Sequence, residues 1–146
     1  MEIEASNYNF LYNPQDSNSV DMIHTLLRDT YWAAERTRNE VEESLKKSLT
    51  IVVLHANEGI VGCARAITDK ITFSWICDVV VAHSHRGIGL GKMLVGKLIK
   101  HPDVIHTRKI LVTKDAQGLY RKFGFGTHKY ECMIKYPDTD EPQPTL

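Results

Sequence analysis

The segment from Asp78 to Met93, DVVVAHSHRGIGLGKM, joins a short apolar run to a loop that contains three glycines. Val79–Val81 carry β-branched side chains, which favour a buried strand. The pattern then changes, because Leu90, Leu94 and Leu98 recur every four residues, as on one face of a helix. We therefore expect a strand, a glycine-rich loop and a helix, in that order.

This segment carries a local excess of positive charge. The chain has 18 basic and 18 acidic residues and no net charge, yet no Asp or Glu stands between Asp78 and Asp103. The basic residues there are Arg86, Lys92, Lys97 and Lys100. The first N–H groups of a helix lack intrahelical partners, and the helix dipole is positive there. Glycines also let a ligand approach the backbone. The loop is therefore typical of a site for a phosphate-bearing ligand.

Two common phosphate motifs do not match this loop. A P-loop needs Gly-x-x-x-x-Gly-Lys-Ser/Thr, but Arg86 stands at its first glycine and Met93 at its hydroxyl residue. A dinucleotide fingerprint, G-x-G-x-x-G, counted from Gly87 meets Lys92 at its third glycine. The loop belongs to neither class.

The loop does resemble the acetyl-CoA loop of the GNAT superfamily of N-acetyltransferases, whose pattern is Gln/Arg-x-x-Gly-x-Gly/Ala. Arg86, Gly89 and Gly91 fill its three fixed positions. A later family pattern, Ala-x-x-Leu-Tyr-x-x-x-Gly-Phe, is filled by Ala116, Leu119, Tyr120, Gly124 and Phe125. The resemblance covers about residues 51–125 well, and the first 50 residues only by the order of their elements.

The resemblance implies acetyl-CoA as cosubstrate. In the family, the loop and helix start hold the pyrophosphate, and the preceding strand pairs its backbone with the pantetheine arm. The residues that we expect to contact the cofactor are Val79, Val80, Val81, Arg86, Gly87, Ile88, Gly89, Leu90, Gly91, Lys92, Asp115 and Tyr120. Asp115 stands where relatives often have Asn, and it can still cap the helix that follows.

Tyr120 and Asp78 are the expected catalytic residues. By the resemblance, the Tyr120 phenol protonates the leaving thiolate, although the ring could instead only pack its helix against the sheet. The attacking amine must be neutral. Deprotonating an ammonium of pKa near 10.4 costs roughly 4.6 kcal/mol at pH 7. Asp78, at the edge of an apolar run, is the leading base. It could equally pair with Arg65 or Lys70, and His83 is a second option for the base.

The acceptor side in this family is formed by the first two helices and the last hairpin. Tyr31, Trp32 and Glu35 lie between the two expected helices. An aromatic pair beside a carboxylate would suit a cationic amine. The alternative is that these aromatic rings close the core at a helix–helix corner.

The rest of the chain predicts a mixed α/β (α+β) domain, a GNAT-type mixed sheet of about six to seven strands flanked by about four helices. Expected strands cover residues 8–12, 51–54, 60–67, 71–81 and 109–113, with the last strands in 125–136. A turn at 57–59 joins the second and third strands. Expected helices begin at Ser17, after Thr37 and at Leu90, and a short one covers 116–123. Thr37 and Glu40 have capping-box spacing, with Val41, Leu45 and Leu49 on one face.

Composition restricts the class of protein. The chain has 146 residues, 42% hydrophobic and 25% charged, as expected for a soluble globular protein. We expect one domain over 1–136 and a polar, acidic tail over 137–146. Three scattered cysteines without a CxxC pair, and no secretion signal or membrane span, indicate a cytoplasmic protein. Zero net charge gives no sign of nucleic-acid or membrane binding. His83-x-His85 lacks further ligands, so no metal is expected.

The function expected from the resemblance is acetyl transfer from acetyl-CoA directly to a primary amine, here a small-molecule amine. The acceptor could instead be a protein lysine or N-terminus, since Glu40, Glu42 and Glu43 would suit an acidic groove. A non-catalytic acyl-CoA-binding module also stays open, although the presence of Tyr120 counts against it. A nucleic-acid binder is disfavoured, because the basic helix lacks interleaved aromatic residues. A homodimer stays open.

Overall fold

The computed structural model describes residues 7–138, which belong to two compact units, one ending at Asp115 and one beginning at Ala116. The first unit contains β1 (Tyr8–Tyr12), α1 (Ser17–Arg28), α2 (Arg38–Lys46), β2 (Leu49–His55), β3 (Gly59–Thr68), β4 (Phe73–Val81), α3 (Leu90–Lys100) and β5 (Arg108–Ile110). A short 3-10 helix, His83–His85, follows β4. The second unit contains α4 (Gln117–Arg121).

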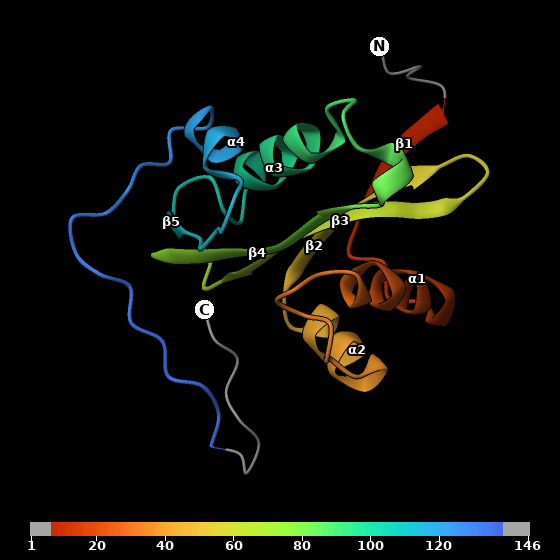
Figure 1. The fold of residues 1–146 in the computed structure, drawn as a ribbon, viewed down its shortest axis with the longest axis horizontal. Coiled ribbons are helices and arrows are strands. Elements are labelled where there is room, and N and C mark those ends of the chain that lie inside the picture. Colours follow the sequence, from red (N-terminus) through yellow and green to blue (C-terminus); the bar gives the residue numbers. More distant parts are fainter. Residues whose placement is uncertain (1–6, 139–146) are drawn as a thin grey trace. The chain divides into compact units, whose positions relative to one another are not determined.

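The five strands form one mixed sheet in the order β1-β2-β3-β4-β5. Neighbouring strands are antiparallel, except that β4 and β5 are parallel and joined through α3. α1 and α2 lie on one face of the sheet and α3 on the other (Figure 1). The expected mixed α/β fold and its strand-loop-helix-strand crossover are confirmed.

The helices begin where the local sequence predicts. Asp16 caps α1 by accepting from the Ser19 N–H, and Thr37 and Glu40 form the expected capping box at α2. α3 begins after Gly89, whose φ of 90° is left-handed and thus suits glycine. Its buried side chains include Leu90, Leu94 and Leu98, which are the predicted apolar face.

β4 contains a bulge that the sequence did not reveal. The β3–β4 register passes from Cys63 opposite Val80 to Arg65 opposite Cys77, so Asp78 and Val79 together face Ala64. Asp78 has φ 52°, a left-handed conformation that Asp tolerates better than most residues. Such an extra residue locally disrupts the strand ladder and re-aims side chains.

The sheet is smaller than expected, with five strands among the described residues instead of six to seven. Residues 125–136 contain no strand. Their side chains are largely exposed, for example Tyr130 at 68% and Met133 at 91%. Lys129 and Glu131 also interrupt any continuous apolar run, so this sequence supplies no buried face to hold a strand in a sheet.

Several element boundaries also differ from the sequence prediction, and α4 is shorter than the expected 116–123. Leu49 begins β2 and does not continue the face of α2. The expected strand over 109–113 is only Arg108–Ile110, because Val112 beyond it is half exposed. β4 begins at Phe73, not at residue 71, since the Asp69 carboxylate accepts from three successive N–H groups there and closes a turn.

Candidate active site

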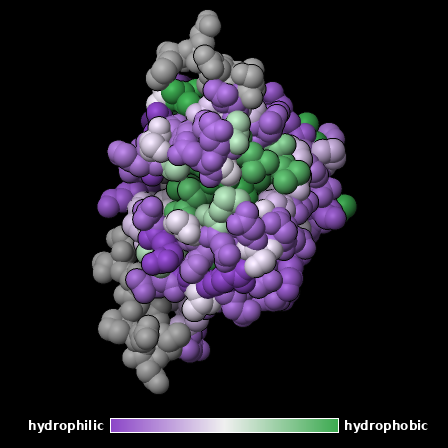
Figure 2. All heavy atoms as spheres, turned by 90° about the vertical axis from the view of Figure 1, so that its right-hand side faces the viewer, coloured by the Kyte–Doolittle hydropathy of each residue, from purple (hydrophilic) through white to green (hydrophobic). Residues whose placement is uncertain are grey.

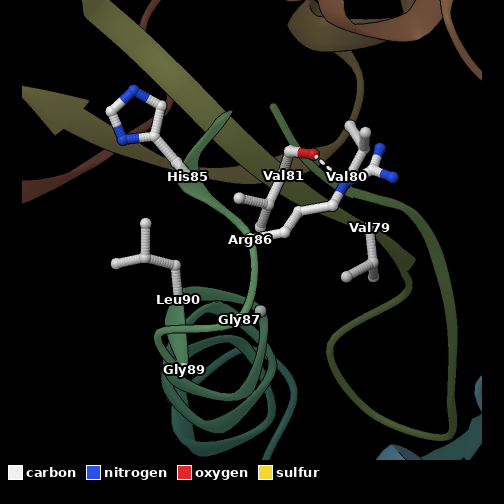
Figure 3. A pocket seen from close by; sticks show the side chains of 9 residues that line it. Val79, Val80, Val81, His85, Arg86, Gly87, Gly89 and Leu90 are labelled. Atoms are coloured by element: carbon white, nitrogen blue, oxygen red, sulfur yellow. Dashed lines mark hydrogen bonds between the residues drawn. The ribbon is translucent and has the colours of Figure 1, made fainter. Parts of the chain in front are cut away.

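A pocket of about 220 Å³ lies between the end of β4 and the start of α3. Figure 3 shows the valines of β4 and the glycine loop on opposite sides of it. It is lined by Val79, Val80, Val81, His85, Arg86, Gly87, Gly89, Leu90 and Gly91. Eight of these nine were expected from the sequence as cofactor contacts, while the expected Ile88 and Lys92 do not line the pocket.

Backbone atoms are accessible along the glycine loop. A Cβ at Gly87 would meet nothing within 4 Å, and one at Gly91 would meet only a Val81 methyl at 3.9 Å. The first α-helical bond of α3 joins the Met93 N–H to the Gly89 carbonyl. Helix geometry therefore leaves the preceding N–H groups, those of Leu90, Gly91 and Lys92, without intrahelical partners. No acidic residue stands in the first turn, so the helix start suits an anion.

Arg86 is held against the strand, because its Nε donates to the Val81 carbonyl at 2.8 Å (Figure 3). This bond fixes the arginine at the mouth of the pocket and satisfies the last carbonyl of β4.

The far edge of β4 is open along its second half. β5 pairs only with Phe73–Trp75, so within the described part of the first unit residues 76–81 have a strand neighbour on the β3 side alone. An unpaired strand edge offers backbone N–H and C=O groups to an extended ligand. This edge leads directly into the pocket.

Asp78 lies at the bulge and is bound on both carboxylate oxygens. Trp32 Nε1 donates to Oδ1 at 3.1 Å, and Arg36 and Arg65 donate to Oδ2 at 2.7 and 2.9 Å. Asp78 is only 4% exposed. Of the two partners named from the sequence, Arg65 pairs with it, while Lys70 instead lies 3.8 Å from Asp103. Arg36 was missed, because it is 42 positions away in sequence and no local pattern links the two.

These contacts decide the protonation state of Asp78. Burial alone raises the pKa of the carboxyl, but the charges and hydrogen bonds of Arg65 and Arg36 outweigh burial and hold the pKa below its usual value. A carboxylate in this state is a weak proton acceptor near neutral pH. The geometry thus favours the ion-pair alternative over the role of base.

Tyr31 and Trp32, the expected acceptor contacts, lie in the connection between α1 and α2. They do not close the core, since they are 63% and 42% exposed, and their rings meet edge to face at 5.0 Å. Lys114 places its ammonium 5.4 Å from the Tyr31 ring centroid. Glu35 is exposed in the same connection.

Asp115 and Tyr120 mark the boundary and the start of the second unit. Asp115 ends the first unit and does not cap α4, whose N-cap residue is Ala116 and which has no side-chain cap. Tyr120 is a buried residue of α4, and its ring packs edge to face on Phe125 at 5.9 Å. Its place beside a thioester stays a prediction.

A second cleft, of about 590 Å³, lies between α1, the β2–β3 hairpin and the segment after β4. It shares Val80, Val81, His85 and Arg86 with the first pocket. Figure 2 views the molecule from the side of this hairpin and shows a band of hydrophobic residues with hydrophilic margins.

His85 lines both cavities and was not expected from the sequence as a site residue. Its Nδ1 meets the Tyr8 hydroxyl at 2.8 Å. Its Nε2 lies 2.7 Å from Glu58 Oε2, which is within ion-pair distance. The two atoms do not form a hydrogen bond, because the angle at the donor is unfavourable. The expected alternative base, His83, lines the second cleft only.

Within residues 7–138, no group of three or more His, Cys, Asp or Glu side chains gathers closely enough to hold a metal ion. In the same range, no helix combines the length and apolar character needed to cross a bilayer.

Comparison with known proteins identifies relatives along most of the chain. The family profile of the acetyltransferase (GNAT) domain matches residues 47–127. The uncharacterized N-acetyltransferase ycf52 of Pyropia yezoensis is 33% identical over 118 residues, which is 77% of this chain and 63% of that protein. Its counterpart in Porphyra purpurea is 31% identical over 135 residues, 88% of this chain and 72% of that protein.

A crystal structure of a GNAT-family protein from Xanthomonas campestris pv. campestris superposes with a TM-score of 0.77 at 31% identity. The alignment covers 88% of this chain and 94% of that one. The two curated relatives are longer, and the chain spans only 63% and 72% of their lengths.

Proposed function

We propose that this chain, which belongs to the GNAT acetyltransferase family, binds acetyl-CoA and transfers its acetyl group directly to a primary amine of a small molecule. The observation that carries the proposal is the pocket where the open edge of β4 meets the glycine-rich start of α3. This one place offers both a strand edge and free helix N–H groups.

The pyrophosphate of acetyl-CoA would bind at Gly87–Lys92. The free N–H groups of the first turn of α3, the helix dipole and the absence of acidic residues all favour a diphosphate there. The pantetheine arm would then run along β4 as an added strand, from Val81 back towards the bulge. This direction puts the thioester near Val79 and Val80.

Backbone N–H groups in this stretch would polarise the thioester carbonyl and hold the oxyanion that forms on attack. Fixed donors at the point where charge develops are usually the largest electrostatic contribution to such reactions. The bulge turns the Asp78–Val79 backbone out of the regular β3 ladder, and an N–H donor there would serve this purpose.

The transfer itself is balanced without a covalent enzyme intermediate. The lone pair of the neutral amine forms the new C–N bond, the C–S bond breaks, and the thiolate takes up one proton while the nitrogen releases one. We assign the Tyr120 phenol as the donor to the thiolate, whose parent thiol titrates near 8.5 if it behaves like free cysteine. Because phenol pKa values lie near 10, this transfer is uphill by about 1.5 pKa units, or roughly 2 kcal/mol, which a positioned hydrogen bond at the forming thiolate can offset.

Thermal denaturation with acetyl-CoA tests the proposal. A ligand at about 100 times its dissociation constant stabilises the folded chain by about 2.7 kcal/mol. For a chain of this size, that raises the Tm by roughly 5–10 °C. Absence of any shift at millimolar acetyl-CoA would refute cofactor binding, and absence of CoA release across a panel of amines would refute transfer.

Gly91 offers a matched pair of variants, because its φ is not left-handed and space is open around it. Gly91→Glu places a carboxylate where the diphosphate would bind, so the acetyl-CoA shift should disappear. The same charge favours the helix start, so the Tm without ligand should not fall. Gly91→Ala adds only a methyl group and should keep the shift.

A further inference from the structure

Two guanidinium groups meet a single carboxylate at the bulge of β4. Arg65 and Arg36 both bind Oδ2 of Asp78, at 2.9 and 2.7 Å. Among the described residues, no second carboxylate lies within ion-pair distance of either arginine. The cluster therefore carries one positive charge in excess, and its arginines stay charged at any physiological pH.

Arg36 is the partner that remains available to a ligand. The Arg65 side chain is only 9% exposed and also approaches Ser48, whereas the Arg36 side chain is 31% exposed. Within residues 7–138, Arg36 uses only its NH1 group, on Asp78. A guanidinium has five N–H donors in a planar fork, so the Nε and NH2 side of Arg36 can bind a second anion. The Arg36 carbonyl accepts from His24 Nε2 at 3.0 Å, which anchors its backbone.

A second cation lies on the same side. Lys114 holds its ammonium 5.4 Å from the Tyr31 ring, and that ring contacts Trp32, whose indole N–H binds Asp78. The aromatic face that would suit a cationic amine therefore already has a cation of the protein itself.

The excess charge lies next to the strand residues where the proposed function puts the thioester. Asp78 directly precedes Val79, the first strand residue of the cofactor pocket. An acceptor that approaches a thioester at Val79–Val80 from the α1–α2 side thus passes Trp32 and Arg36.

We infer that the acceptor is an amine that also carries an oxyanion, a carboxylate or a phosphate, and that Arg36 binds this group while Arg65 keeps Asp78 paired. This inference rests on the proposed function. A planar guanidinium pairs with either oxyanion through two parallel N–H bonds.

Matched acceptors test the inference on the wild-type chain. Phenylalanine is compared with 2-phenylethylamine, and phosphoethanolamine with ethanolamine, by CoA release at saturating acetyl-CoA. We expect kcat/KM to be at least tenfold higher for the anionic member of at least one pair, and the better pair distinguishes carboxylate from phosphate. Preference for the members without an oxyanion, or for polyamines, would overturn the inference while leaving acetyl transfer established.

Variants then assign the preference to Arg36. Arg36→Gln should reduce the anionic-to-neutral ratio of kcat/KM at least tenfold, and Arg36→Lys should retain part of it. Arg28→Gln, an exposed arginine of α1 outside the cluster, should leave the ratio unchanged. An unchanged ratio in Arg36→Gln would overturn the assignment.

Inorganic phosphate gives a readout that does not depend on a variant folding. Inhibition of the wild-type chain should be competitive with the acceptor; inhibition competitive only with acetyl-CoA would count against an anion site at Arg36. The acetyl-CoA thermal shift is recorded for each variant, because its loss would show that the cofactor site, and not the acceptor site, had failed.

Discussion

Replacement of Asp78 by Asn should destabilise the chain through its two arginines. The amide keeps the size of the side chain, and Asn tolerates the left-handed φ of 52°, so backbone strain is not added. What is lost is the negative charge that Arg65 and Arg36 bind. Removing one partner of a buried ion pair typically costs about 3–5 kcal/mol. Because Arg36 is partly exposed and can regain water, we expect about 3 kcal/mol, or a Tm lower by roughly 6–12 °C.

The loss should depend on pH in a defined direction. The pKa of Asp78 is lower in the folded chain than the value near 3.9 of an unfolded Asp. Its contribution to stability is therefore complete above about pH 4 and is lost as the pH falls through the folded-state pKa. The difference between wild type and Asp78→Asn should be largest at pH 7 and shrink towards pH 3.

Urea denaturation at both pH values measures this difference, with Asp103→Asn as the control. Asp103 lies 3.8 Å from Lys70 in an exposed pair, which should contribute at most about 1 kcal/mol. A loss below about 1 kcal/mol for Asp78→Asn at pH 7, or a loss that does not shrink on acidification, would refute the ion-pair account of Asp78.

Three further predictions concern other parts of the chain. Tyr120→Phe should keep the acetyl-CoA thermal shift and lower kcat at least tenfold, and unchanged turnover would remove the phenol from the mechanism. Gly62→Ala should cost about 1–3 kcal/mol in urea denaturation, because its Cβ would lie 2.8 Å from a β2 valine methyl, whereas Gly118→Ala meets nothing and should not destabilise. Cys132 is exposed, while burial raises the pKa of Cys77 to about 12, so Cys132 should react first with a thiol reagent at pH 8, and equal rates for the two would contradict this burial.

Local patterns in the sequence were sufficient for the features that depend on neighbouring residues. The capping box at Thr37 and Glu40, a turn between β2 and β3, which lies at 56–58 and not at the expected 57–59, and the leucine face of α3 each follow from side chains a few positions apart. The glycine loop is of the same kind, because one continuous segment contains both the glycines that set its backbone conformation and the basic residues that set its charge. Eight of the nine residues that line the pocket at the start of α3 were therefore named from the sequence, while acetyl-CoA binding there stays a prediction.

Other features depend on residues that meet only after folding. Arg36 comes from 42 positions away and no local pattern links it to Asp78, whereas Arg65, 13 positions away on the neighbouring strand, was one of two partners named from the sequence. The bulge that turns Asp78 towards them is a register shift between two strands, so neither strand alone encodes it. The prediction of strands over 125–136 was wrong for a related reason. A strand forms only when another strand pairs with it and one of its faces is buried. The sequence by itself thus determined the glycine loop and helix start that we propose as an anion site, since helix termini and glycines act locally. Only the tertiary structure decided that two arginines meet a single carboxylate at the bulge of β4, since electrostatic interactions depend on distance in space.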